Sequence, residues 1–388
     1  MKRKYSVMNN VYIKKQPDYN LDQISAAAEE MLCWGDIDKV LGPDTTVLLK
    51  PNMLSKSTPE KAVTTHPAVV EAVVNALLHL GAKAENITIA DSSGGPQNPV
   101  VLAANYKACG FADVAQRCGV KLYTKLESRT VKTDGVMVKE FELLAPVTDS
   151  DLIINLPKFK THVMTGMSGA VKNLFGTVPG LKKAEFHMRF PDKDDFADMI
   201  VDLAETVKPH FTIVDGIVGM EGDGPGSGSP RNFGILLAGK NPYYIDGVIC
   251  TMMGFEFTKP PVMKRAVQRG LLPQVLPRDT VQGDLERFAE IPDFKMPKSY
   301  QIDFSDRVPR PIRWATPTVE KFLAPKPKIN KSACIVCGKC RDICPQHTIT
   351  VQNGKARINM KNCIRCFCCH EMCPVKAIDV KRSIFFNI

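Results

Sequence analysis

The chain lacks any stretch that approaches twenty unbroken apolar residues, the length that a membrane-spanning helix needs. Its first residues, MKRKYSVMNNVYIKKQPDYN, are basic but have no apolar segment like that of a secretory signal. It also lacks a P-loop, a flavin motif and the interleaved basic and aromatic residues of nucleic-acid-binding proteins. We therefore expect a cytoplasmic protein with no membrane span and no nucleic acid partner.

The composition is that of an ordinary globular protein. The 388 residues are 44% hydrophobic and 24% charged, with a formal net charge of +10, and they are enough for two or three domains. Thirteen cysteines are present. In a chain without an export signal, this number indicates a reducing compartment, where thiolates stay free to bind metal.

Eight of these cysteines form two runs with the same spacing, C-x-x-C-x-x-C-x-x-x-C-P. The first run is Cys334, Cys337, Cys340 and Cys344, and the second is Cys363, Cys366, Cys369 and Cys373. The runs are halves of an internal repeat, which maps Ile378 onto Ile349 and Pro374 onto Pro345. Short C-x-x-C steps let neighbouring thiolates converge on one cluster, so the repeat predicts two [4Fe-4S] clusters.

Eight cysteines could also form two zinc sites or a disulfide framework. Zinc sites usually pair two C-x-x-C steps, and disulfide frameworks are typical of small secreted chains, so we disfavour both. Cys368 departs from the repeat, because Lys339 occupies the equivalent position. It is either a spare ligand or redox thiol, or a residue packed beside the cluster, and we favour the packing role.

The repeat resembles the two-cluster bacterial-type ferredoxin domain over about residues 329–381. That resemblance implies crossed ligation, in which each cluster takes three cysteines from one run and the fourth from the other. It assigns one cluster to Cys334, Cys337, Cys340 and Cys373, and the other to Cys363, Cys366, Cys369 and Cys344.

The preceding residues alternate between helix and strand patterns. Helical spacing marks residues 21–41, 100–118 and 195–208, and Thr64 and Thr65 are expected to cap another helix that begins at Pro67. Between them lie strand-like runs such as TTVLLKPNML, NITIADSS and HFTIVDGIVGME, and DLIINLPKFKTH is expected to be a buried strand that runs into a basic loop. This order predicts an α/β fold, a mostly parallel sheet with helices on both faces, followed by a small C-terminal α+β ferredoxin-like module.

The domain boundaries follow from changes in composition. Residues 1–300 are expected to form the α/β domain, residues 301–328 a proline-rich basic linker, and residues 329–388 the domain of the two [4Fe-4S] clusters.

Polar residues follow the predicted strands, and ligands of open α/β sheets bind at the carboxyl ends of strands. Within residues 155–180, closely spaced basic side chains and glycines suit a phosphate or carboxylate ligand, although a solvated basic loop explains them equally well. The candidate substrate-binding residues are Lys50, Asn52, Asp91, Ser92, Lys158, Lys160, Lys172 and Asn173.

Three residues are candidates for catalysis. His66, His162 and Asp215 could donate or accept protons, because imidazole titrates near neutral pH and carboxylates act as general acids and bases. Helix capping and turn formation are alternative roles for His66 and Asp215. Glu221, Asp223 and Asp246 are further carboxylates for a cation or for proton transfer. The glycine-rich GDGPGSGSP is expected to be a loop or lid rather than a phosphate-binding turn.

A series of blocks resembles the family known as domain of unknown function 362 over about residues 45–255. The blocks are VLLKPNML, TTHPAVVEAVVNALLHLGA, ADSSGGP, INLPKFKTH, GAVKNLFGTVPG, KAEFH, VDGIVGMEGDGP and PYYIDGV. The resemblance implies that these strand-end segments form one site, and that a ferredoxin module often accompanies the domain. It implies no substrate.

Two functional hypotheses remain open. In the first, the protein is an iron-sulfur oxidoreductase, which takes electrons from a redox partner protein such as a ferredoxin, flavodoxin or reductase and passes them to a small anionic substrate. A two-electron reduction then needs both clusters or an additional cofactor such as a flavin. In the second, it is a non-catalytic ferredoxin-like carrier or a metal-site assembly factor that binds a partner protein. A pocket of convergent lysine, histidine and carboxylate groups favours the first, and a flat apolar patch favours the second.

Overall fold

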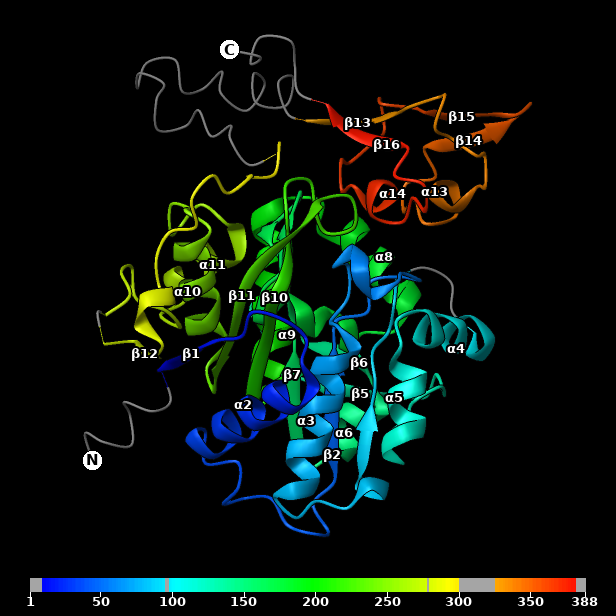
Figure 1. Ribbon diagram of the computed structural model, residues 1–388. Coiled ribbons are helices and arrows are strands. Elements are labelled where there is room, and N and C mark those ends of the chain that lie inside the picture. Colours follow the sequence, from blue (N-terminus) through cyan, green and yellow to red (C-terminus); the bar gives the residue numbers. More distant parts are fainter. Residues whose placement is uncertain (1–8, 95–97, 278, 300–324, 382–388) are drawn as a thin grey trace.

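The computed structural model describes residues 9–94, 98–277, 279–299 and 325–381, in a large α/β domain and a small C-terminal module (Figure 1). Most of the predicted linker, residues 301–324, lies outside the described residues. Within the described residues, no helix is long and apolar enough to cross a membrane.

The α/β domain is built on a ten-stranded sheet, whose main path runs β12-β1-β11-β10-β7-β2-β3-β4. All neighbours on this path are parallel except β11, which runs antiparallel to β1 and β10. The predicted mostly parallel sheet is therefore confirmed. The strands are β1 Val11–Lys15, β2 Val47–Pro51, β3 Ile87–Ile89, β4 Lys121–Leu122, β7 Leu152–Leu156, β10 Phe211–Glu221, β11 Ser229–Gly239 and β12 Val281–Gly283, with β8 Lys158–His162 and β9 Gly166–Met167 off the path.

Helices cover both faces of this sheet, so both faces of its strands are buried. In β2, Leu48 belongs to one core cluster, whereas Val47 and Leu49 belong to the other, as the two-residue period of a strand requires. One face packs on α2 Leu21–Trp34, α3 Pro67–His79, α4 Pro99–Ala108 and α5 Phe111–Cys118. The other packs on α6 Ala145–Asp149, α7 Ala170–Asn173, α9 Lys193–Val207, α10 Pro242–Met252 and α11 Pro261–Gln268.

The α/β domain has further elements among the described residues. They are helix α8 Gly180–Arg189, the hairpin of β5 Ser128–Lys132 and β6 Glu140–Leu144, and four 3₁₀ turns at Pro59–Lys61, Ala84–Asn86, Leu174–Thr177 and Leu285–Arg287.

Several predicted helix boundaries were wrong, each for a local reason. The helix expected over 21–41 ends at Trp34, because Asp36 has a positive φ of 57°, a left-handed conformation that an α-helix cannot continue through. The helix expected over 100–118 is two helices, α4 and α5, separated at Gly110, whose φ is +81°. The cap of α3 is His66 rather than a threonine, since its imidazole accepts a hydrogen bond from a backbone N–H.

The C-terminal module keeps the internal repeat of its sequence. Strand β13 Lys326–Ile329 pairs antiparallel with β16 Ile378–Lys381, and β14 Ile349–Gln352 pairs antiparallel with β15 Lys355–Ile358. One short helix follows in each half, α13 Lys339–Asp342 and α14 Cys368–Glu371. Because β13 begins at Lys326, the module starts within the segment assigned to the linker. Helices α13 and α14 face the α/β domain, near α8 (Figure 1).

Candidate functional site

The eight repeated cysteines surround two small cavities in the module, each of about 20 Å³. Each cavity is lined by three cysteines of one run and the last of the other run. The first is lined by Cys334, Cys337, Cys340 and Cys373, and the second by Cys363, Cys366, Cys369 and Cys344. Among the described residues no three His, Cys, Asp or Glu side chains are close enough to hold a single metal ion, but a cubane is larger than an ion.

The backbone around both cavities has the features that a cluster site needs. The equivalent residues Val336 and Arg365 have positive φ angles of 57° in both halves. Backbone N–H groups donate to the last cysteine of each run, from Thr348 to Cys344 Sγ at 3.4 Å and from Ala377 to Cys373 Sγ at 3.1 Å. Hydrogen bonds to sulfur stabilise thiolates and tune cluster potentials, so the residues present fit two [4Fe-4S] clusters.

A third cavity, the inner cavity, lies between the α/β domain and the module and has a volume of about 90 Å³. Seven of the predicted site residues line it: Asn52, Asp91, Ser92, Lys160, His162, Lys172 and Asn173. The module contributes Ile343, Cys368, Glu371 and Met372 to the same lining, and α8 contributes Lys183 and His187. Basic, acidic and imidazole groups therefore converge on one cavity.

Three lysines of the inner cavity differ in how their ammonium groups are bound. Lys160 Nζ donates to Asn52 Oδ1 and to Val63 O, both at 2.7 Å, and Lys183 Nζ donates to Ser92 O. Burial lowers the pKa of both lysines to about 7. Lys172 Nζ instead lies 5.3 Å from the ring centre of Phe175, and burial lowers its pKa as well. An anion in the cavity would favour the charged form of all three.

The two histidines of the inner cavity are neutral at pH 7, because burial lowers the pKa of His162 to about 4 and that of His187 to about 3. His162 Nδ1 accepts from Met164 N at 3.1 Å, which places the proton on Nε2, 3.2 Å from Glu371 Oε1. His187 is 5% exposed, and its Nδ1 has no hydrogen-bond partner among the described residues. A ligand is therefore able to meet an unpaired imidazole nitrogen.

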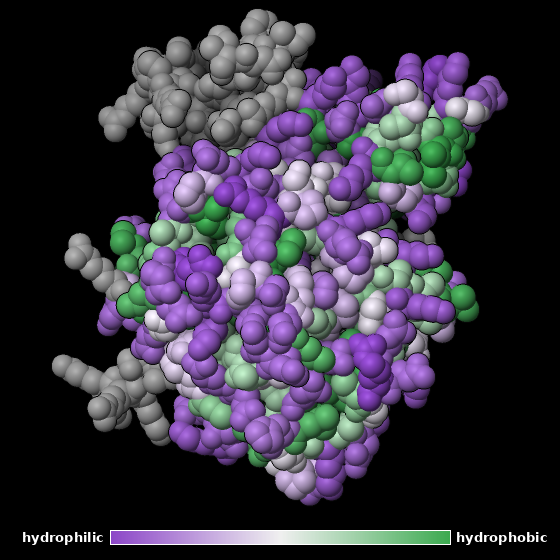
Figure 2. All heavy atoms as spheres, viewed as in Figure 1, coloured by the Kyte–Doolittle hydropathy of each residue, from purple (hydrophilic) through white to green (hydrophobic). Residues whose placement is uncertain are grey.

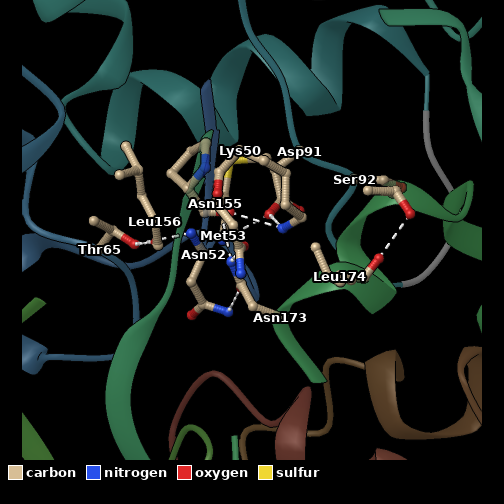
Figure 3. Close-up of polar contacts among 12 residues, drawn as sticks. Lys50, Asn52, Met53, Thr65, Asp91, Ser92, Asn155, Leu156, Asn173 and Leu174 are labelled. Atoms are coloured by element: carbon tan, nitrogen blue, oxygen red, sulfur yellow. Dashed lines mark hydrogen bonds and ion pairs between the residues drawn. The ribbon is translucent and has the colours of Figure 1, made fainter. Parts of the chain in front are cut away.

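A buried polar network fixes the strand-end loops beside the inner cavity (Figure 3). Lys50, at the end of β2, forms an ion pair with Asp91, which follows β3, and donates to Pro51 O at 2.8 Å. Asn52 donates to Asn173 Oδ1 at 2.9 Å, and Asn173 donates to Asn155 Oδ1 at 2.7 Å. Since these residues come from different strand ends, the network holds the strand-end loops in one arrangement. Lys50 is part of this network, and it is not one of the described residues that line the inner cavity.

The structure places Lys158, His66 and Asp215 in a separate cluster, outside the described lining of the inner cavity. Lys158 Nζ lies 2.7 Å from Asp215 Oδ2, and both side chains are fully buried. Asp215 also accepts from Tyr19 at 3.1 Å and from the backbone N–H of His66 at 2.8 Å. The His66 ring stacks on Tyr19 at 3.6 Å, and burial lowers its pKa to about 4. These groups satisfy one another, as in a structural cluster.

The predicted basic loop was wrong in its secondary structure. Lys158, Lys160 and His162 lie on strand β8, which pairs with β10 through Asp215 and Met220 in an irregular register. The strand is buried along its whole length. These residues therefore form a buried strand rather than a solvated loop, and their polar side chains lie in the interior of the protein.

The other predicted carboxylates have structural partners. Asp246 accepts from the backbone N–H groups of Ala170 and Val171 at the start of α7, and Glu221 lies 2.9 Å from Arg231. The glycine-rich segment connects β10 to β11, and its Pro225 lines the inner cavity. It therefore contributes a wall of the site.

Four lining residues from the module were not anticipated, above all Cys368 and Glu371. The one available signal was the repeat itself, because Cys368 replaces Lys339 of the first half. Cys368 lines both the second cysteine cavity and the inner cavity. The position that breaks the repeat is thus the position where the two sites meet.

Family comparisons agree with this architecture. The domain of unknown function (DUF362) matches residues 47–251, and a 4Fe-4S dicluster domain matches residues 326–374. The first match covers more than half of the chain. The protein therefore belongs to the DUF362 family and carries a 4Fe-4S ferredoxin domain, which supports cluster binding and an electron-transfer role.

One relative and one solved structure give further context. The thylakoid-associated protein sll1697 of Synechocystis sp. is 29% identical over 320 residues, which cover 79% of this chain and 93% of that protein. The lactate racemase apoprotein of Thermoanaerobacterium thermosaccharolyticum is 15% identical with a TM-score of 0.36, over 61% of this chain and 54% of that chain. The second similarity is too low to carry a functional argument.

Proposed function

We propose that the protein is an iron-sulfur oxidoreductase whose ferredoxin module delivers electrons to an anionic ligand in the inner cavity. The observation that carries this proposal is the position of Cys368, which lines both the cysteine cavity of the second run and the inner cavity. No wide layer of protein then separates the two sites. Short separation is what electron delivery between them requires.

In this proposal two [4Fe-4S] clusters are held by crossed ligation, Cys334, Cys337, Cys340 and Cys373 around one and Cys363, Cys366, Cys369 and Cys344 around the other. Each cluster, when bound, supplies one electron at a time. The cysteines differ in their exposure to solvent: Cys337 is exposed and Cys369 is buried.

The residues of the inner cavity have distinct proposed roles. Lys172 and Lys183 bind the negative charge of the ligand, and Asn52 and Lys160 hold the floor in place. His162, with its proton on Nε2, is better placed than His66 or Asp215 to deliver a proton, since those two lie in the separate buried cluster. The convergence of lysine, imidazole and carboxylate groups favours an enzyme over a carrier or assembly factor.

The first run is proposed to receive electrons from a redox partner protein such as a ferredoxin, flavodoxin or reductase. The surface of the module has a patch of apolar residues (Figure 2). Ile335 and Val375, which line the first cysteine cavity, are 61% and 39% exposed. Exposed apolar side chains beside a cluster site suit transient protein contact. A cytoplasmic location, with reduced thiols, remains part of this proposal.

Mass spectrometry tests the function directly. The holoprotein is purified without oxygen, and its co-purifying ligand is identified before and after addition of dithionite. A two-electron reduction takes up two protons, with dithionite as reductant and the ligand as oxidant, so the ligand mass should rise by two hydrogens. A ligand that stays unchanged while the clusters are reduced would favour the non-catalytic alternative.

A further inference from the structure

A second, larger cavity adjoins the inner cavity at the interface between the two domains. This outer cavity has a volume of about 310 Å³, compared with about 90 Å³ for the inner one. The two share Gly94, Ile343, Glu371 and Met372 in their linings. A ligand seated in the inner cavity therefore has space to extend past Met372 into the outer one.

The outer cavity carries positive charge of its own. Lys56, which follows β2, and Lys339, which begins α13, both line it and are exposed. Its acidic side chains are Asp342, which lies 2.7 Å from Arg341 and is compensated by that guanidinium, and Glu371, which lies 3.2 Å from His162 Nε2. Polar side chains complete the lining: Ser55, Ser93 and Asn105. A second anionic group would thus find cations and hydrogen-bond donors there.

The two cavities also touch different cysteines. The inner cavity is bounded by Cys368, beside the second cysteine cavity, whereas the outer cavity is bounded by Cys373, which lines the first. A ligand that occupies both spaces lies beside both cluster sites. Since each site handles single electrons, this arrangement suits a two-electron reduction without another cofactor.

We propose that the ligand is an extended organic dianion, with one acidic group in the inner cavity near Lys172 and a second in the outer cavity near Lys56 and Lys339. This proposal rests on the proposed function and adds the chemical class of its substrate. A small inorganic anion would fill the inner cavity alone. An elongated diacid would use the charge of both.

Two valines of α4 provide a matched test. Val101 lines the outer cavity and is 40% exposed, whereas the neighbouring Val100 is 77% exposed and belongs to neither described lining. Val101→Trp places an indole ring in part of the outer cavity without changing a cysteine or an inner-cavity residue. Val100→Trp places the same ring on the same helix, outside the site.

The measurement is isothermal titration calorimetry of the anaerobic holoprotein with adipate, a six-carbon dicarboxylate, and with acetate. Adipate should bind at least tenfold more tightly than acetate. Val101→Trp should remove that advantage and leave acetate binding unchanged, and Val100→Trp should have no effect on either. Equal affinities of the two acids, or equal effects of the two tryptophans, would overturn the extended-dianion proposal.

A third variant separates this proposal from the proposed function. Lys172→Met should abolish binding of both acids, because both need the inner cavity. If Lys172→Met removes acetate binding but Val101→Trp spares adipate, the inner anion site stands and the outer one is refuted. If Lys172→Met changes neither, the inner site itself is refuted, and the dianion proposal with it.

Discussion

The two halves of the ferredoxin module share one backbone pattern but differ in how deeply they are buried. In the first half Cys337, Lys339 and Arg341 are exposed. At the equivalent positions of the second half, Cys366 is half-buried, and Cys368 and His370 are buried. The second half is therefore buried more deeply against the α/β domain than the first half. The residues that the two halves share form the cluster scaffold. The positions at which the halves differ, such as Cys368 and Lys339, are those that pack differently against the α/β domain.

The position after the second cysteine of each run makes this difference concrete. Gly338 has a φ of +81°, which a glycine adopts without strain. Its counterpart Phe367 has a φ of +59°, an unusual value for a bulky residue. Phe367 is 3% exposed and packs with Val163 of the α/β domain and Val380. Interdomain burial of the ring offsets the backbone cost that glycine avoids in the first half.

The largest expected effect comes from removing the one cysteine that each half contributes to the cluster of the other half. Cys373→Ser should remove the cluster of the first run, and Cys344→Ser that of the second. In each variant the iron content should fall from about eight to about four atoms. Anaerobic iron and sulfide analysis with cluster-resolved EPR spectra measures this. If Cys373→Ser altered the second run's signal instead, ligation would not be crossed.

The next largest effect is on anion affinity, where a lysine of the inner cavity should matter more than a neighbouring surface lysine. Lys183→Met removes a cation from the inner cavity, so acetate affinity should fall at least tenfold, by about 1.4 kcal/mol or more. Lys182 is the matched control, because it is 44% exposed and its Nζ lies 3.3 Å from Glu185 and 3.8 Å from Glu142. Lys182→Met should leave the affinity within a factor of two. Similar losses in both variants would indicate a general charge effect rather than a site.

The affinity for anions should also depend on pH. Burial lowers the pKa of Lys160 and Lys183 to about 7, so both ammonium groups lose protons as the pH rises through that value. Anion binding favours the charged form. Acetate affinity should therefore fall about tenfold from pH 6 to pH 8, if one proton is required. Calorimetry across this range measures how acetate affinity changes with pH, and Lys183→Met should weaken that dependence. An affinity that rose with pH would contradict this prediction.

The smallest effect concerns an equivalent pair of carboxylates, Glu371 and Asp342. Glu371 lies beside His162 with a side-chain exposure of 12%, whereas Asp342 is exposed. Glu371→Gln should lower the free energy of unfolding by about 1–3 kcal/mol, because the contact between the Glu371 carboxylate and neutral His162 loses its charge. Asp342→Asn should change it by less than about 0.5 kcal/mol. Thermal unfolding of the anaerobic proteins compares them, and equal effects would remove the proposed asymmetry of the halves.

Much of the fold could be predicted from sequence because its signals are local. The C-x-x-C steps place cysteines within a few residues of each other, and strand and helix periodicity appears in runs such as TTVLLKPNML. Helix ends were less predictable. Gly35, at the end of α2, packs against Phe211, and the sequence does not show a contact between residues so far apart in the chain.

Of the residues that line the inner cavity, the sequence predicted several from the strand ends, but not those that the packing of distant segments brings there. Lys160 and His162 line the inner cavity, but Lys158 on the same strand joins Asp215 in the separate cluster. The irregular pairing of β8 with β10 has no sequence pattern of its own. Glu371 reaches the cavity only through the docking of the module, and that docking depends on contacts between residues distant in sequence.

EPR of the dithionite-reduced holoprotein, with and without acetate, tests most directly whether the inner cavity lies next to the second-run cluster, as electron delivery from that cluster requires. The signals are first assigned with Cys373→Ser and Cys344→Ser. The structure places Cys368 between the inner cavity and the second cysteine cavity, so acetate should shift the signal of the second-run cluster and leave the other unchanged. A shift of the first-run signal alone, or of neither signal while acetate is bound, would contradict the account.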